Sequence, residues 1–137
     1  MLEVGGQVYN RNQKPEIRNQ KPEIEKMNIE AIVKALDLKV FSGEAGLSRE
    51  VTGGYVSDLL SDVMGNADAG YVWVTLQTHK NVMAIASLKD LAGVILVNSH
   101  KPDESTVEQS NEENIPILGT EMSAFEVTGR LYELINK

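Results

Sequence analysis

Apolar residues recur from position 27 onward in two kinds of spacing. In some segments they fall three or four positions apart, which is the period of an α-helix. In others they run consecutively or alternate, which is typical of strands. The helical spacing predicts helices over 28–37, 55–64, 81–88, 103–114 and 123–135. The apolar runs predict strands over 38–41, 71–76, 93–97 and 115–119.

Polar residues at the expected helix starts support these boundaries. Either Asp103 or Ser105 can cap the fourth helix, with Glu108 three positions after Ser105 as in a capping box. Ser123 and Glu126 form the same pattern before the last helix. We therefore expect both helices to begin at these residues.

The order of elements predicts the fold class. Strands that alternate with helices over short connections imply right-handed crossovers and a mainly parallel sheet covered by helices. The expected fold is therefore α/β, with three layers in the order α/β/α. Within 71–76, Tyr71 and Trp73 point to the same face, and we expect them to pack in the core rather than stack on a bound base.

The first 26 residues differ from everything after them. They contain a tandem repeat of the heptapeptide RNQKPEI, over 11–17 and 18–24, which is polar and interrupted by Pro15 and Pro22. Proline disfavours helix at the residue before it and lacks a backbone donor. We therefore divide the chain into a flexible polar arm, 1–26, and a folded domain, 27–137.

Composition excludes several classes of function. The chain has no cysteine, which excludes disulfides, thiolate metal sites and a cysteine nucleophile, and indicates a cytoplasmic protein. Its net charge is −7, and residues 27–137 carry 16 acidic and 8 basic side chains, so we expect no nucleic-acid partner. No apolar stretch is long enough to cross a membrane, and none has the pattern of a secretory signal.

Polar loops follow the predicted strands at the edge of the sheet where ligands of such folds collect. The loops over 77–80 and 98–101 both lead through a histidine and a lysine into a helix, and could hold a phosphate or carboxylate. Solvated loops without a ligand are the alternative. The residues that we take as candidates for ligand binding at these strand ends are Thr75, Gln77, Thr78, His79, Asn98, Ser99, His100, Lys101 and Thr120.

A pair of glycines adds a further candidate. Thr52, Gly53 and Gly54 precede the predicted second helix, and adjacent glycines allow close approach of a ligand or of another segment. An ordinary tight turn would use glycine for the same reason. We include these three residues in the candidate ligand site.

We expect neither a catalytic centre, nor a metal, nor a cofactor. The chain lacks the phosphate-binding loop, the dinucleotide fingerprint and the nucleophile elbow. His79 and His100 could bind a metal with Asp103 or Glu104, but these residues lack the fixed helical spacing of a metal motif.

Four segments in order resemble a DRTGG domain: 51–54, 74–79, 91–98 and 115–120. The resemblance covers 27–137 and is greatest to stand-alone members related to HPr kinase. It implies a fold like the N-terminal domain of HPr kinase/phosphorylase, and an accessory role on phosphotransacetylases or nucleotide-sensing pyrophosphatases, often at a dimer interface. The chain reads Arg-Glu-Val-Thr-Gly-Gly over 49–54 where the family name has Asp-Arg-Thr-Gly-Gly. Kinase activity is not implied, because it belongs to a separate domain with a phosphate-binding loop.

These observations lead to three hypotheses. The first is a non-catalytic regulatory domain, a homodimer by the family resemblance, that senses a small anionic or nucleotide-like metabolite. The second is a protein-interaction module that docks onto a metabolic enzyme complex. The third is a small enzyme that acts through His79 or His100.

Overall fold

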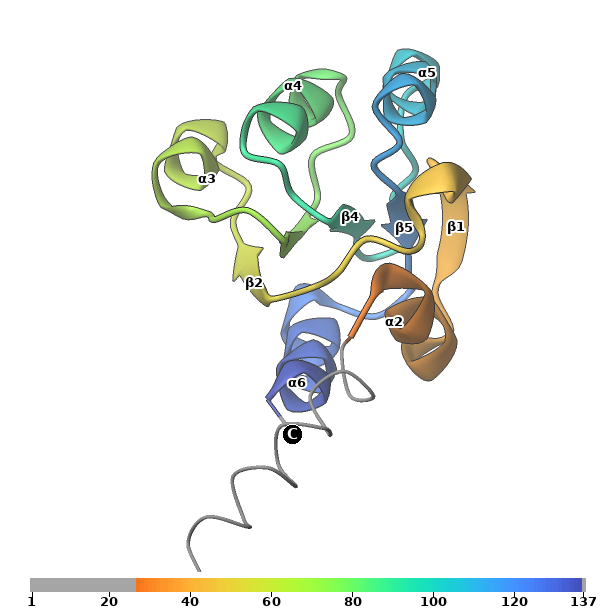
Figure 1. The fold of residues 1–137 in the computed structure, drawn as a ribbon, viewed down its shortest axis with the longest axis vertical. Helices are drawn as coiled ribbons and strands as arrows, with labels where there is room; N and C mark the ends of the chain where they lie inside the picture. Colours follow the sequence, from red (N-terminus) through yellow and green to blue (C-terminus); the bar gives the residue numbers. More distant parts are fainter. Residues whose placement is uncertain (1–26, 137) are drawn as a thin grey trace, which may run out of the picture.

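The computed structural model describes residues 27–136, which form a five-stranded sheet covered by helices on both faces (Figure 1). The arm over 1–26 and its repeat lie outside the described residues, so the division of the chain at position 26 stays a prediction. The strands are β1 (Lys39–Ser42), β2 (Gly53–Val56), β3 (Tyr71–Thr75), β4 (Gly93–Leu96) and β5 (Ile117–Gly119). The helices are α2 (Ile29–Leu36), α3 (Leu60–Asn66), α4 (Asn81–Leu88), α5 (Glu104–Glu113) and α6 (Ala124–Ile135), with a short 3₁₀ turn, η1 (Glu44–Gly46).

The predicted parallel sheet is confirmed. The strand order is β1-β5-β4-β3-β2, and the pairs β2–β3, β3–β4 and β4–β5 are parallel. The strand β1 runs antiparallel, along the outer side of β5. The helices α3, α4 and α5 cover one face, and α2 and α6 cover the other (Figure 1). The three-layer α/β/α fold follows from this arrangement.

The alternation of side chains along the buried strands produces two separate cores. In β3, Val72 and Val74 pack beneath α2 and α6, whereas Trp73 packs with Val82 and Met83 of α4 on the opposite face. Trp73 is fully buried, and its ring N–H donates to the carbonyl of Ser57 at 2.8 Å. The expectation that Trp73 packs in the core rather than stacking on a base agrees with this position.

One predicted helix boundary is wrong. We expected a helix from Tyr55, but residues 53–56 form the edge strand β2, and α3 begins only at Leu60. The spacing of Val56, Leu59 and Val63 resembles a helical face, and two glycines lower the strand propensity of this segment. Pairing with β3 overrides both signals, and it places Gly53 opposite Tyr71.

Of the two predicted capping boxes, the one at the start of α6 is confirmed and the one at the start of α5 is wrong. Ser123 caps α6, where its hydroxyl accepts a hydrogen bond from the backbone N–H of Glu126 at 3.2 Å. The predicted box of Ser105 and Glu108 is wrong, because α5 begins at Glu104. Asp103 takes the cap position there, without a capping bond from its side chain.

Candidate functional site

The carboxyl ends of β3, β4 and β5 lie side by side at one edge of the sheet, as the sequence predicts. The loops after β4 and β5 are joined there by backbone hydrogen bonds. The N–H of Asn98 donates to the carbonyl of Met122, and the N–H of Ser99 donates to the carbonyl of Thr120, both at 2.9 Å. These bonds hold the two loops as one rigid rim.

A crevice of about 560 Å³ opens beside this rim. Four of the residues predicted from the sequence line it: Ser99, His100, Lys101 and Thr120. The crevice is completed by residues of β1, the β5 loop, α2 and α6 that the sequence analysis did not single out: Leu36, Asp37, Lys39, Phe41, Gly119, Glu121, Met122, Glu126 and Arg130.

The topology explains why the crevice opens at this place. The connections from β2 to β5 all carry their helices over one face of the sheet, whereas the chain after β5 crosses to the other face as α6 (Figure 1). Where successive connections leave on opposite faces, their loops separate and a crevice forms between them. The antiparallel strand β1 then supplies the outer wall.

Two consecutive residues of the rim have an unusual backbone. Asn98 has φ 55° and Ser99 has φ 63°, both in the left-handed region that residues with a side chain rarely adopt. Such strain persists only where the surrounding structure enforces it, and it concentrates at binding sites. Here the bonds to Thr120 and Met122 enforce it, and they direct the backbone from β4 towards the crevice.

The walls of the crevice carry charges of both signs around one aromatic ring. Lys39, Lys101 and Arg130 provide cations. The side-chain nitrogen of Lys39 lies 5.0 Å from the centre of the Phe41 ring. A carbon added to Gly119 would lie 2.3 Å from that ring, so glycine is needed at this position. The combination of a flat ring and cations suits a planar, negatively charged molecule.

The two histidines of the candidate loops are used differently. His79 accepts a hydrogen bond at Nδ1 from the backbone N–H of Asn81 at 3.2 Å, so this nitrogen carries no proton and supports the start of α4. The Nδ1 of His100 lies 3.1 Å from the carbonyl of Val97 and 3.2 Å from that of Asn98. Because carbonyls only accept, this nitrogen is the donor, and Nε2 of His100 is left for other partners.

The polar groups of the loop after β3 form hydrogen bonds with Asp58 and Thr106 of this chain. The carboxylate of Asp58 accepts from the hydroxyl of Thr75 and from the N–H of Leu76, both at 2.8 Å. The Gln77 amide donates to the carbonyl of Asp58 at 2.8 Å, and the Thr78 carbonyl accepts from the Thr106 hydroxyl at 2.8 Å. Thr75, Gln77, Thr78 and His79 are not among the residues that line the crevice.

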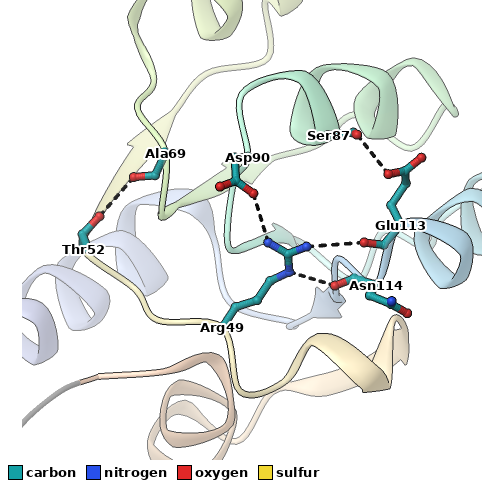
Figure 2. Close-up of polar contacts among 7 residues, drawn as sticks. All are labelled: Arg49, Thr52, Ala69, Ser87, Asp90, Glu113 and Asn114. Carbon is teal, nitrogen blue, oxygen red and sulfur yellow. Dashed lines mark hydrogen bonds and ion pairs between the residues drawn. The ribbon is translucent and has the colours of Figure 1, made fainter.

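The glycine pair lies at the opposite edge of the sheet, where β2 begins. Thr52 donates from its hydroxyl to the carbonyl of Ala69 at 3.2 Å (Figure 2). A carbon added to Gly53 would lie 2.6 Å from the Tyr71 ring. Thr52, Gly53 and Gly54 line a separate hollow of about 280 Å³ between β2 and α6, so the structure does not bring them together with the crevice.

Arg49 lies at the same edge of the sheet as Thr52 and contacts the ends of two helices. Its guanidinium donates to the carbonyls of Asn114 and Glu113, at 2.8 and 3.4 Å, and lies 3.3 Å from the carboxylate of Asp90 (Figure 2). These carbonyls end α5, where a cation is favoured by the helix dipole. The arginine of the Arg-Glu-Val-Thr-Gly-Gly segment thus joins the end of α5 to the end of α4.

The described residues contain neither a metal-binding group nor a membrane-spanning helix. Within 27–136, no group of three or more His, Asp or Glu side chains is placed to hold a metal ion. In the same range, no helix has the length and apolar character needed to span a bilayer.

Comparison with known proteins finds matches among solved structures. No family model matches the chain, and no curated protein matches its sequence. Ten solved chains match its structure. One is the regulatory region of a Clostridium perfringens pyrophosphatase, which contains CBS and DRTGG domains and is complexed with the activator diadenosine tetraphosphate.

The match has a TM-score of 0.61 at 14% sequence identity and covers 79% of this chain. The chain spans about half of that region, since 46% of it is covered. At this identity the likeness concerns the fold, and it agrees with the DRTGG resemblance of the sequence. The comparison with HPr kinase stays a prediction. The chain thus has an α/β fold similar to part of a regulatory region that contains a DRTGG domain.

Proposed function

We propose that this domain is a non-catalytic regulatory module that senses a small anionic, nucleotide-like metabolite in the crevice beside β4 and β5. The observation that carries the proposal is the convergence of Lys101, Arg130 and the Phe41 ring on one cavity at the strand ends. The structural neighbour supports it, because that regulatory region is complexed with a nucleotide activator.

The binding mode follows from the chemistry of the walls. A phosphate or carboxylate would be held by Lys101 and by Arg130, which must first leave its 3.0 Å contact with Glu126. A planar group would stack on Phe41, in the place where Lys39 now lies over the ring. With its proton on Nδ1, His100 would accept a hydrogen bond at Nε2 from a hydroxyl or amino group of the ligand. The acidic residues Asp37 and Glu121, which also line the crevice, would select against ligands of very high negative charge.

Isothermal titration of the full chain against nucleotides, dinucleoside polyphosphates and acyl phosphates tests this function. We expect a member of the panel to bind, and Lys101→Ala to weaken its affinity about tenfold. The matched control is Lys80→Ala, which changes the net charge equally in the other histidine-lysine loop but does not line the crevice. An affinity that falls equally in both variants, or no binding at millimolar concentrations, would contradict the proposal.

The second candidate function is a protein-interaction module that docks onto a metabolic enzyme. The observation that favours it is the exposure of Phe125, which is 91% accessible, and of Tyr132, which is 67% accessible, on α6. Pull-down with purified candidate enzymes would test it. Loss of the complex in Phe125→Asp, with retention in Lys101→Ala, would assign the function to this surface rather than to the crevice.

A further inference from the structure

The strand β2 leaves one margin of the sheet open (Figure 1). It is the last strand in the order, and among residues 27–136 it pairs with β3 and with no other strand. Its residues, Gly53–Val56, include no charge and no proline. Charged residues and prolines are usual means by which proteins prevent an edge strand from pairing further. The β2 margin can therefore accept one more strand.

The first described residues already pair with the segment that leads into β2. Asn28 forms an isolated antiparallel bridge with Glu50. Next to this bridge, the N–H of Val51 donates to the carbonyl of Met27 at 2.8 Å. The chain at 27–28 therefore runs antiparallel to 50–51, as in the first step of an antiparallel ladder.

This contact lies on the open side of the chain that enters β2. The N–H of Thr52 donates to the carbonyl of Gly70, on the side of β3, at 3.0 Å. Successive N–H groups of an extended chain point to opposite sides. The N–H of Val51, and the carbonyl of Met27 that accepts from it, therefore lie on the side away from β3. A chain continued from Met27 towards the N-terminus in this direction would run along the open margin of β2.

The segment before Met27 suits this margin in length and in backbone donors. Residues 23–26 read Glu-Ile-Glu-Lys and separate Pro22 from Met27, and β2 has four residues. Each residue of 23–26 has a backbone N–H, whereas Pro22 has none and would end the pairing. Glu25, two positions before Met27, would present its N–H and its carbonyl to β2 as Met27 does to Val51.

The side chains of such a strand would also find partners. Met27 packs against the core beneath α2 and α6, so Glu25 would point to the same face of the sheet. On this face the hydroxyl of Thr128 is buried, has no hydrogen-bond partner among the described residues, and lines the hollow beside β2. The Glu25 carboxylate would supply the missing acceptor. Ile24 would point to the opposite face, where the half-buried Tyr55 packs against the second core.

We propose that residues 23–26 of this chain add a strand to the sheet, antiparallel to β2. Met27 holds the end of this segment at the margin, so the segment is present there at a far higher effective concentration than a separate chain. The part of the predicted arm that stays flexible would then end at Pro22. Because Gly53–Val56 do not line the crevice, the pairing is independent of the function proposed there.

Hydrogen exchange of the full chain, followed residue by residue with nuclear magnetic resonance, tests this pairing. We expect slow exchange of the amides of 53–56 that point away from β3. Glu25→Pro should speed their exchange about tenfold or more, because proline removes a donor of the ladder. The matched control is Glu16→Pro, the same change on the other side of Pro22, which should leave the exchange unaltered. Since both positions precede Met27, both variants should fold as the wild type does.

Dilution separates the chain's own segment from other occupants of the margin. A strand from the same chain protects these amides equally at every protein concentration, and this is the expected result. Fast exchange of the outward amides in the wild type, no change in Glu25→Pro, or an equal change in Glu16→Pro would overturn the proposal. Protection that is lost on dilution would overturn it as well, because another molecule would then be the occupant.

Discussion

At the scale of single residues, two similar loop sequences take on different roles. His79 and His100 each stand between a strand end and a lysine, yet one ring supports a helix start and the other lies against the crevice. The sequence predicts that both occupy one edge, because strand ends are visible as the limits of apolar runs. It cannot predict which ring nitrogen is free, because that depends on which carbonyls the folded loop turns inward.

The pair of Tyr55 and Asp62 provides a pH-dependent contact of known sign. The Tyr55 hydroxyl donates to the Asp62 carboxylate at 2.8 Å. This hydrogen bond lowers the pKa of Asp62, and the same bond raises the pKa of Tyr55. The stability from the lowered Asp62 pKa is fully present above the ordinary pKa of a carboxyl group, and it is lost as the pH falls through the lowered pKa of Asp62 in the folded protein. The stability from the raised Tyr55 pKa is fully present below the ordinary pKa of tyrosine, and it is lost as the pH rises through the raised pKa of Tyr55.

We expect Tyr55→Phe to raise the pKa of Asp62 towards its ordinary value, because the strongest hydrogen bond to the charged form is removed. Titration of the carboxyl carbons by nuclear magnetic resonance measures this change. Tyr71→Phe is the control, because Tyr71 packs elsewhere in the same core cluster and should leave the Asp62 titration unaltered. An unchanged Asp62 pKa in Tyr55→Phe would show that the hydrogen bond is not formed in solution.

At the scale of elements, buried strands are the easiest to predict. The runs over 93–97 and 115–119 are apolar throughout because both faces of β4 and β5 are covered by helices. The edge strand β2 lacks that signature, and its glycines are explained only by what lies over them, such as the Tyr71 ring over Gly53. The same limit applies to the crevice. Its β1 wall, with Phe41, depends on which side of the sheet the first strand joins, and that is a long-range contact.

The ends of elements also depend on residues distant in sequence, and Arg49 is the clearest case. We expect Arg49→Ala to lower the free energy of unfolding by about 1–2 kcal/mol, because two helix-ending carbonyls and one carboxylate lose a charged donor. Chemical denaturation measures the change. Lys34→Ala removes the exposed pair with Glu30 and should cost only about 0.3–0.5 kcal/mol. Equal losses in the two variants would contradict the capping role of Arg49.

At the scale of the whole molecule, α6 connects the crevice with the exposed surface around Phe125. Glu126 and Arg130 line both the crevice and the hollow beside Phe125. A ligand that draws Arg130 into the crevice would break its contact with Glu126. Occupancy of the crevice should therefore alter the surface around Phe125.

The two margins of the sheet formed by residues 27–136 are not equivalent in what they present to a further strand. At the far margin, β1 has an irregular register between Val40 and Ser42 and presents the exposed Lys39, features that discourage further strand pairing. The β2 margin carries no charge or proline and keeps a regular register. A strand added to this sheet should therefore pair with β2 rather than with β1.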